Sequence, residues 1–217
     1  PAYNEELMTA KVCRTLKEIL DHEGISYELV LVDDGSSDGT WNQIEQIAEQ
    51  DPNITGVHFS RNFGKEAAIV AGLAQASGDA VAVMDCDLQH PPDTLVKMFR
   101  LWEQGYEVVE GIKTNRGKES LLHRKSAGFF YGIMSRATGF DMQNASDFKL
   151  LDRKAVESVL SMPERSMFFR ATSSWIGYRS ISVLFEVQER EAGESKWSAR
   201  SLISYAFRNI VAFTTLP

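Results

Sequence analysis

Two aspartates that follow an apolar run have the most distinctive chemistry in this sequence. In VAVMDCDLQHPPD (81–93), Asp85 and Asp87 close a predicted buried strand, and Gln89 lies two positions further on. Residues i and i+2 of extended backbone point the same way, so these side chains are expected to converge. Such oxygen ligands select Mg²⁺ or Mn²⁺, and an ion that bridges a diphosphate relieves the repulsion between two carboxylates. The stretch therefore predicts a metal-bound diphosphate.

A helix cap is the competing interpretation of the same stretch. Asp87 or His90 would then only cap the helix that begins through Pro91 and Pro92, because acidic residues and early prolines are common at helix starts. The residues alone leave both interpretations open.

A second acidic pair, Asp33 and Asp34, closes an earlier apolar run in VDDGSSDGT. In a doubly wound sheet such carboxylates accept hydrogen bonds from the base or ribose of a nucleotide. They equally suit a turn, because Ser36 and Asp38 are good turn and N-cap residues. The spacing supports both roles.

A pair of cations surrounds the next strand-to-helix junction. SRNFGKEAA places Arg61 and Lys65 on either side of Gly64, where a helix N-terminus favours a phosphate. A solvated basic pair would show the same pattern. The sequence contains neither the P-loop nor the dinucleotide fingerprint.

Regular alternation of strands and helices must position these groups. Apolar runs predict strands at 27–34, 54–60, 79–85 and 106–112, and helical spacing predicts helices at 5–20, 40–50, 65–76 and 93–104. Further along, the pattern predicts helices near 121–137, 152–160, 166–175 and 198–213, with strands at 146–151 and 179–187. These elements predict an α/β fold with a mostly parallel sheet and helices on both faces. Ligands of such sheets lie outside the carboxyl ends of the strands, where the acidic pairs are.

Composition narrows the class of protein. The chain has 217 residues, 43% of them hydrophobic, two cysteines and a net charge of −7, which fits one globular domain without a disulfide framework. Residues 1–110 carry 20 acidic and 7 basic side chains, whereas residues 111–217 carry 10 and 16. An acidic half suits metal cations, and a basic half suits anions or a membrane surface. Because PAYNEE reads as a loop that leaves a strand, we expect a first strand before Pro1.

Five ordered motifs, PAYNEE, VDDGSSDGT, SRNFGKEAA, DCDLQHPPD and REAGESKWS, resemble family 2 glycosyltransferases. The resemblance covers nearly the whole chain and is greatest to polyprenyl-phosphate glycosyltransferases such as bactoprenol glucosyltransferases and dolichyl-phosphate mannose synthases. It implies a GT-A fold and inverting transfer from a UDP- or GDP-sugar to a polyprenyl phosphate of the undecaprenyl type, with Mg²⁺ or Mn²⁺. It also implies a place at the cytoplasmic face of a bacterial membrane. No nucleic-acid partner is expected, and a homo-oligomer is left open.

The resemblance also implies roles for individual residues. The nucleotide pocket would comprise Pro1, Tyr3, Glu5, Asp33, Asp34, Lys65 and Asp85, and the metal ligands would be Asp85, Asp87 and Gln89. Acceptor binding would involve Arg116, Arg124, Ser195 and Trp197, and the catalytic set would be Asp87, Asp147, Arg190 and Lys196.

The resemblance divides the chain into a catalytic domain at 1–197 and an amphipathic helix at 198–217. Arg200, Ser204 and Arg208 form one stripe of that helix opposite a broad apolar face. We expect it to lie on the membrane surface and to lead into membrane-spanning segments, although a helix that faces the core has the same periodicity.

Other enzyme and binding functions compete with this interpretation. A family 2 transferase acting on a sugar or protein hydroxyl would need a catalytic base, whereas a phosphate acceptor is already largely dianionic at neutral pH. A nucleotidyltransferase would need a glycine-rich basic loop near the start, which the sequence lacks. A non-catalytic nucleotide-sugar binding module is the remaining alternative.

Overall fold

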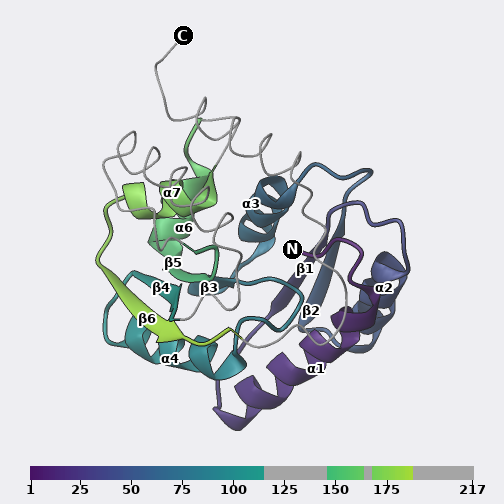
Figure 1. Cartoon of the computed structure of the whole chain (residues 1–217), viewed down its shortest axis with the longest axis horizontal. Coiled ribbons are helices and arrows are strands. Elements are labelled where there is room, and N and C mark those ends of the chain that lie inside the picture. Colours follow the sequence, from purple (N-terminus) through teal and green to yellow (C-terminus); the bar gives the residue numbers. More distant parts are fainter. Residues whose placement is uncertain (115–145, 164–167, 188–217) are drawn as a thin grey trace, which may run out of the picture.

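The computed structural model describes residues 1–114, 146–163 and 168–187, and these form an α/β fold (Figure 1). Its elements are, in chain order, α1 (Glu6–His22), β1 (Leu29–Asp33), α2 (Thr40–Gln50), β2 (Ile54–His58), α3 (Lys65–Gln75), β3 (Ala80–Val83), α4 (Pro92–Glu103), β4 (Val108–Lys113), β5 (Lys149–Asp152), α6 (Arg153–Leu160), α7 (Phe169–Trp175) and β6 (Ser180–Phe185).

The strands form a parallel pair and a mixed sheet. β1 pairs with β2 in parallel, and β3, β5, β4 and β6 form a second sheet in that order. Within it β4 and β6 are parallel, but β5 runs antiparallel to both of its neighbours. The predicted α/β class is confirmed, and β5 is the strand that departs from a parallel arrangement.

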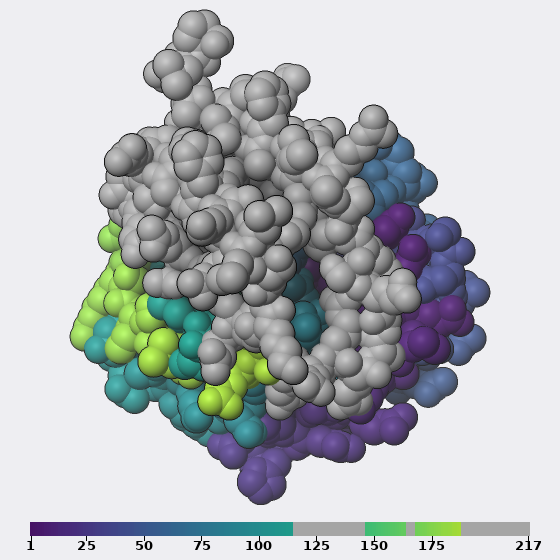
Figure 2. Space-filling model, in the orientation of Figure 1, coloured from purple at the N-terminus to yellow at the C-terminus, as the bar shows by residue number. Residues whose placement is uncertain are grey.

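Consecutive residues of β4 and β5 face opposite sides of the mixed sheet. Val109 and Leu150 pack in one cluster with residues of α1 and α4, whereas Val108 and Leu151 pack in another with α3, α6 and α7. Helices therefore cover both faces, as apolar residues in unbroken runs predict (Figure 1). The space-filling view shows the molecule from the same side, with α1 in purple at the lower edge and β6 in yellow-green on the left (Figure 2).

The predicted elements agree with the structure within a few residues wherever it describes them. α2 has the predicted bounds, but β3 ends at Val83, two residues earlier than expected. The helices expected at 121–137 and 198–217 lie outside the described residues, and so do Arg116, Arg124, Arg190, Ser195, Lys196 and Trp197. Among the described helices, none has both the length and the apolar character of a membrane span.

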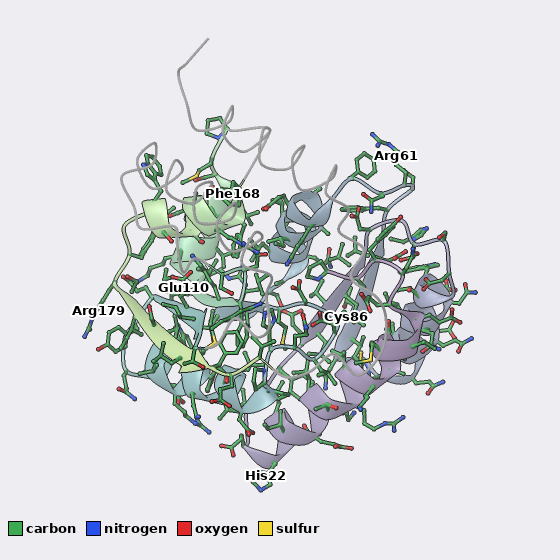
Figure 3. All side chains as sticks on the ribbon, in the orientation of Figure 1. His22, Arg61, Cys86, Glu110, Phe168 and Arg179 are labelled. Carbon is green, nitrogen blue, oxygen red and sulfur yellow. The ribbon has the colours of Figure 1, made fainter. Side chains whose placement is uncertain are left out.

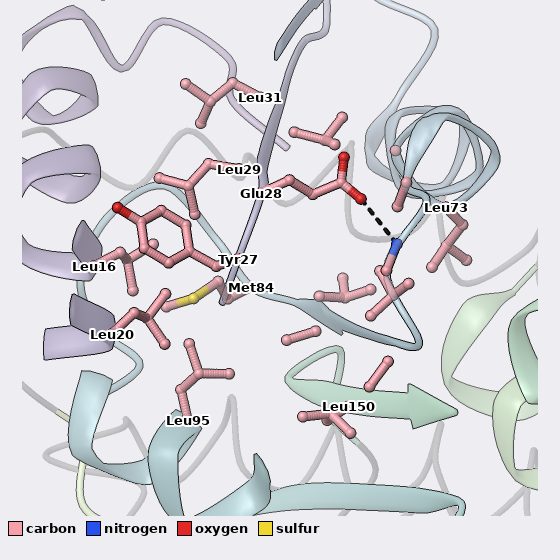
Figure 4. A pocket seen from close by; sticks show the side chains of 18 of the residues that line it. Leu16, Leu20, Tyr27, Glu28, Leu29, Leu31, Leu73, Met84, Leu95 and Leu150 are labelled. Atoms are coloured by element: carbon pink, nitrogen blue, oxygen red, sulfur yellow. Dashed lines mark hydrogen bonds between the residues drawn. The ribbon is translucent and has the colours of Figure 1, made fainter. Parts of the chain in front are cut away.

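A cavity of about 390 Å³ separates β1 from β3 and is lined mainly by apolar side chains (Figure 4). Leu16 and Leu20 reach it from α1, and Leu73 reaches it from α3. Among the described residues, β3 pairs only with β5, and β1 pairs only with β2 and, through one parallel bridge, with Ala2. The facing edges of the two strands thus offer backbone groups to a further strand.

The backbone at Ala2 already runs beside β1 as a parallel strand would. Ala2 N donates to Val32 O (2.7 Å), and Asp34 N donates to Ala2 O (2.9 Å). A strand that enters the cavity and leads into Ala2 would continue this ladder. The first strand expected before Pro1 stays a prediction, and the cavity is where it would fit.

We expect an apolar strand of about five residues, added before Pro1, to stabilise the fold by filling this cavity. Burial of even one aliphatic side chain contributes about 2 kcal/mol, and each kcal/mol shifts a domain of this size by roughly 2–4 °C, so the melting temperature should rise by about 4–8 °C. Calorimetry would compare this chain with one that carries a Gly/Ser extension of equal length. Equal melting temperatures for the two extensions would contradict the assignment.

Candidate active site

The turn after β3 carries the predicted metal ligands. Because β3 ends at Val83, Asp85 and Asp87 lie in irregular backbone, where Leu88 adopts a positive φ of 56°. The extended backbone that was expected to make the two side chains converge is therefore not observed. Asp87 is only 4% exposed, and its carboxylate accepts a hydrogen bond from Gln89 N (3.1 Å).

A capping role for this turn is not observed. α4 begins after Pro91 without a side-chain hydrogen bond to its first turn, so neither Asp87 nor His90 acts as its cap. His90 is instead buried, with its ring stacked on Phe148 at a centroid distance of 4.5 Å. Its Nδ1 accepts from Asp85 N (3.4 Å), and burial lowers the pKa of this imidazole. A neutral His90 thus helps to fix the backbone at Asp85.

Lys65 connects the predicted metal turn to the carboxylate that precedes β5. Its Nζ lies 2.8 Å from Asp85 Oδ1 and 2.8 Å from Asp147 Oδ2. Arg170 of α7 holds the other side of Asp147 in a bidentate pair, with Nε 2.7 Å from Oδ1 and Nη2 2.8 Å from Oδ2. We refer to Asp85, Lys65, Asp147 and Arg170 as the ion cluster.

Burial and charge oppose each other within the ion cluster. Burial disfavours ionisation of Asp147, which is 3% exposed, but the two cations outweigh it and hold the pKa of this carboxyl far below its usual range. The pKa of Asp85 is also lowered, because Lys65 outweighs its desolvation. The two carboxylates in turn raise the pKa of Lys65 against the effect of burial. All three groups are therefore charged at neutral pH.

The acidic pair at the end of β1 anchors loops. Asp33 is fully buried, and its carboxylate accepts from Ser36 N (3.2 Å) and contacts His58 Nδ1 (2.7 Å). Asp34 accepts from the backbone amides of Phe63 (2.7 Å) and Gly64 (3.0 Å). The turn interpretation of Asp33 is thus observed, and Asp34 ties β1 to the loop before α3. Their predicted contacts with a nucleotide stay predictions.

The first residues of the chain lie near the same end of the strands. Pro1 lines the cavity together with Asp85, and Tyr3 is 37% exposed. Glu5 N donates to Thr40 Oγ1 (2.8 Å), which joins the start of α1 to α2. Pro1 and Asp85 thus both border the cavity between β1 and β3, and the nucleotide contacts expected of Pro1, Tyr3 and Glu5 stay predictions.

The two cations of SRNFGKEAA separate in the structure. Arg61 lies at the outer edge of the molecule (Figure 3), where its guanidinium packs over the ring of Phe63 at 4.1 Å. Lys65 points inward to the ion cluster. Only Lys65 therefore belongs to the candidate site.

Sequence reasoning missed the groups that surround Asp147 on β5 and α7. Lys149 has a fully buried side chain that pairs with Glu110 Oε1 (3.2 Å) and donates to Ser173 Oγ (2.9 Å). Its spacing of two from Asp147 was a usable signal, because residues i and i+2 of a strand share a face. Arg170 gave no comparable signal, since its partner lies 23 positions earlier in the chain.

The donor atoms at the turn are of the type that a divalent metal ion prefers. Asp85 and Asp87 offer carboxylate oxygens, Gln89 offers an amide oxygen, and Asp85 keeps 33% of its side chain exposed. The described residues contain no cluster of three or more His, Cys, Asp or Glu side chains placed to hold a metal, so the two aspartates would provide only part of its ligands. Mg²⁺ and similar ions complete such partial sets with water and substrate phosphates. These residues therefore suit a metal that binds together with a diphosphate.

The described residues have the fold of GT-A glycosyltransferases. Residues 1–160 match the family described as Glycosyl transferase family 2, and the chain belongs to this family. It is accordingly a glycosyltransferase.

Relatives with related names and folds support this membership. The bactoprenol glucosyl transferase of Shigella phage SfV is 35% identical over 218 residues, which cover 100% of this chain and 71% of that protein. Glucosyl-3-phosphoglycerate synthase from Mycobacterium tuberculosis, solved with Mn²⁺, UDP-glucose and phosphoglyceric acid, shares the fold with a TM-score of 0.63. It is 21% identical, and the match covers 98% of this chain and 76% of that one. A mannosyltransferase from Pyrobaculum calidifontis, solved with GDP-Man and Mn²⁺, gives a TM-score of 0.57 at 22% identity, covering 88% and 56%.

We expect Asp147→Asn to lower the free energy of unfolding by about 3 kcal/mol at pH 7, because it leaves two half-buried cations without their buried carboxylate. The depressed pKa means that this contribution is present above the unfolded value of about 3.9 and is lost as the pH falls below it. Urea titrations would measure the free energy of unfolding of both proteins at pH 7 and below pH 4. The difference between the variant and wild type should be smaller at the lower pH. The control is Glu45→Gln on the exposed face of α2, and a cost there equal to that of Asp147→Asn would argue against the ion cluster.

Proposed function

We propose that the protein transfers a hexose, with inversion, from a nucleotide-diphosphate sugar to the phosphate of a polyprenyl phosphate, using a divalent metal ion. The observation that carries the proposal is the ion cluster, which places the predicted metal ligand Asp85 beside the fully ionised Asp147. The name of the phage relative, a bactoprenol glucosyl transferase, supports the lipid acceptor.

The turn after β3 would bind the donor. Asp85, Asp87 and Gln89 would hold the metal, which when bound would neutralise charge on the diphosphate leaving group. The buried environment of Asp87 and the His90 contact would keep the turn in place as the donor binds. The solved relatives with UDP-glucose and GDP-Man fit a UDP- or GDP-sugar donor.

The state of Asp147 favours a phosphate acceptor over a hydroxyl. A general base works best when its pKa lies near the operating pH, but Lys65 and Arg170 hold the pKa of Asp147 far below that range. Asp147 is therefore a poor proton acceptor and would instead orient the sugar or the acceptor. A phosphate monoester needs no base, because its second pKa near 6 leaves it largely dianionic at neutral pH. Attack would then depend on position and electrostatics.

The acceptor side is proposed from residues outside the described part of the chain. Arg190 and Lys196 would hold the acceptor phosphate beneath the anomeric carbon, with further contacts from Arg116, Arg124, Ser195 and Trp197. The helix proposed at 198–217 would lie along the cytoplasmic leaflet, with its arginines toward anionic lipid. Residues 1–197 would form the catalytic domain.

Asp85→Asn and Asp87→Asn should each remove most of the transfer activity and leave the fold intact, because each deletes a charge that would pair with the metal. Radiolabelled sugar transfer and circular dichroism would measure the two properties. Asp79→Asn provides a matched control, since Asp79 is exposed at the opposite end of β3. Near-normal turnover in either of the first two variants, with unchanged metal dependence, would refute the metal assignment.

Polyprenyl phosphate should be a better acceptor than any sugar or protein hydroxyl, because Lys65 and Arg170 make Asp147 a poor base for removing a hydroxyl proton. Rates would be measured with undecaprenyl phosphate in detergent and with hydroxyl acceptors, each with UDP- and GDP-sugars. Faster transfer to a hydroxyl acceptor would replace the lipid assignment with the hydroxyl alternative.

A further inference from the structure

Lys65 contacts the carboxylate oxygens of Asp85 that a metal ion would need. Among the described side chains, it is the only one that forms an ion pair with Asp85, and its Nζ contacts both carboxylate oxygens, at 2.8 and 2.9 Å. Ammonium and metal thus require the same oxygens. A metal ion can gain Asp85 only by displacing or sharing this lysine.

Asp147 does not depend on Lys65 to the same degree. Arg170 already provides Asp147 with two hydrogen bonds, so the carboxylate stays compensated when Lys65 moves. Among the described residues, no second cation lies within ion-pair distance of Asp85, although the charge of Lys113 also acts on it. The exchangeable contact of the ion cluster is therefore the one between Lys65 and Asp85.

The backbone of Lys65 is held in place, while its ammonium group lies between two carboxylates. Lys65 is the first residue of α3. Gly64, which precedes it, has a φ of 101° and donates its backbone N–H to the carboxylate of Asp34. The next residue, Glu66, accepts from Phe169 N (2.9 Å) and so fixes the first turn of α3 against α7. The backbone is thus held on both sides, and only the flexible lysine stem is left to redirect the charge.

We propose that Lys65 is a built-in counter-ion that competes with the metal for Asp85 and releases it to a metal–diphosphate complex. A bare divalent ion must displace Lys65 without providing a new partner for its charge. A metal that arrives with a diphosphate brings phosphate oxygens that can accept from the displaced ammonium. The site therefore binds metal weakly alone and well together with the nucleotide. This inference rests on the proposed role of Asp85 as a metal ligand.

The test is direct binding of Mn²⁺ by calorimetry, first without and then with UDP or GDP. Lys65→Met should bind Mn²⁺ alone about tenfold more tightly than wild type, because Asp85 no longer has a competing cation. The tightening of Mn²⁺ binding by the nucleotide should be smaller in this variant than in wild type. Lys65→Arg keeps the charge and should behave like wild type within about twofold.

Two further variants separate this mechanism from general electrostatics and from misfolding. Arg61→Met removes the same charge four residues earlier, at the outer edge of the molecule, and should leave Mn²⁺ binding unchanged. Lys65→Gln keeps a hydrogen-bond donor toward both carboxylates and serves if Lys65→Met does not fold. Circular dichroism checks each variant.

The outcomes distinguish the inference from the proposed function. If Asp85→Asn leaves Mn²⁺ binding unchanged, the metal assignment itself is wrong. If Asp85→Asn abolishes binding but neither Lys65→Met nor Lys65→Gln strengthens it, the metal site stands and the counter-ion role of Lys65 is refuted. Equal gains for Arg61→Met and Lys65→Met would also refute it, because the effect would then be one of net charge alone.

Discussion

The site depends on the sharing of one ammonium group between two carboxylates that come from different elements. Asp85 follows β3, Asp147 precedes β5, and Lys65 begins α3. Two carboxylates this close repel each other unless a cation lies between them, and burial increases the cost of an unpaired charge. Folding therefore brings Lys65 to the strand ends, and Arg170 completes the compensation from α7. The pairing of these charges thus holds the starts of α3 and α7 at the sheet edge that carries the candidate site.

The elements around this edge could be predicted because their signals are local. Helical spacing gave the bounds of α2, and apolar runs located each described strand to within a few residues. The direction of β5 could not be predicted, because a strand has the same period of two whichever way it runs. The end of β3 was placed two residues late because Met84 continues the apolar run, while the turn at Leu88 requires irregular backbone.

The candidate site was predictable in its residue types and less so in its partners. Asp85, Asp87 and Asp147 were identified from motifs, and Lys65 was identified as a cation near a phosphate. Its contact with both carboxylates could not be derived, because it joins segments 20 and 82 positions away along the chain. Asp33 shows the opposite case, since its turn residues, Ser36 among them, correctly indicated a structural contact.

The ion cluster also bears on the acceptor that we propose. The two cations stabilise the ionised form of Asp147. Because they lower its pKa far below the usual range, Asp147 does not take up a proton at neutral pH. A catalyst with such a residue suits a nucleophile that already carries its own negative charge. The excess of basic side chains in residues 111–217 fits this requirement, because an anionic acceptor needs cations to hold it near the acidic donor site. Under the proposed function, the acidic first half and basic second half of the sequence would correspond to the two substrates, a metal-bound diphosphate and a phosphate nucleophile.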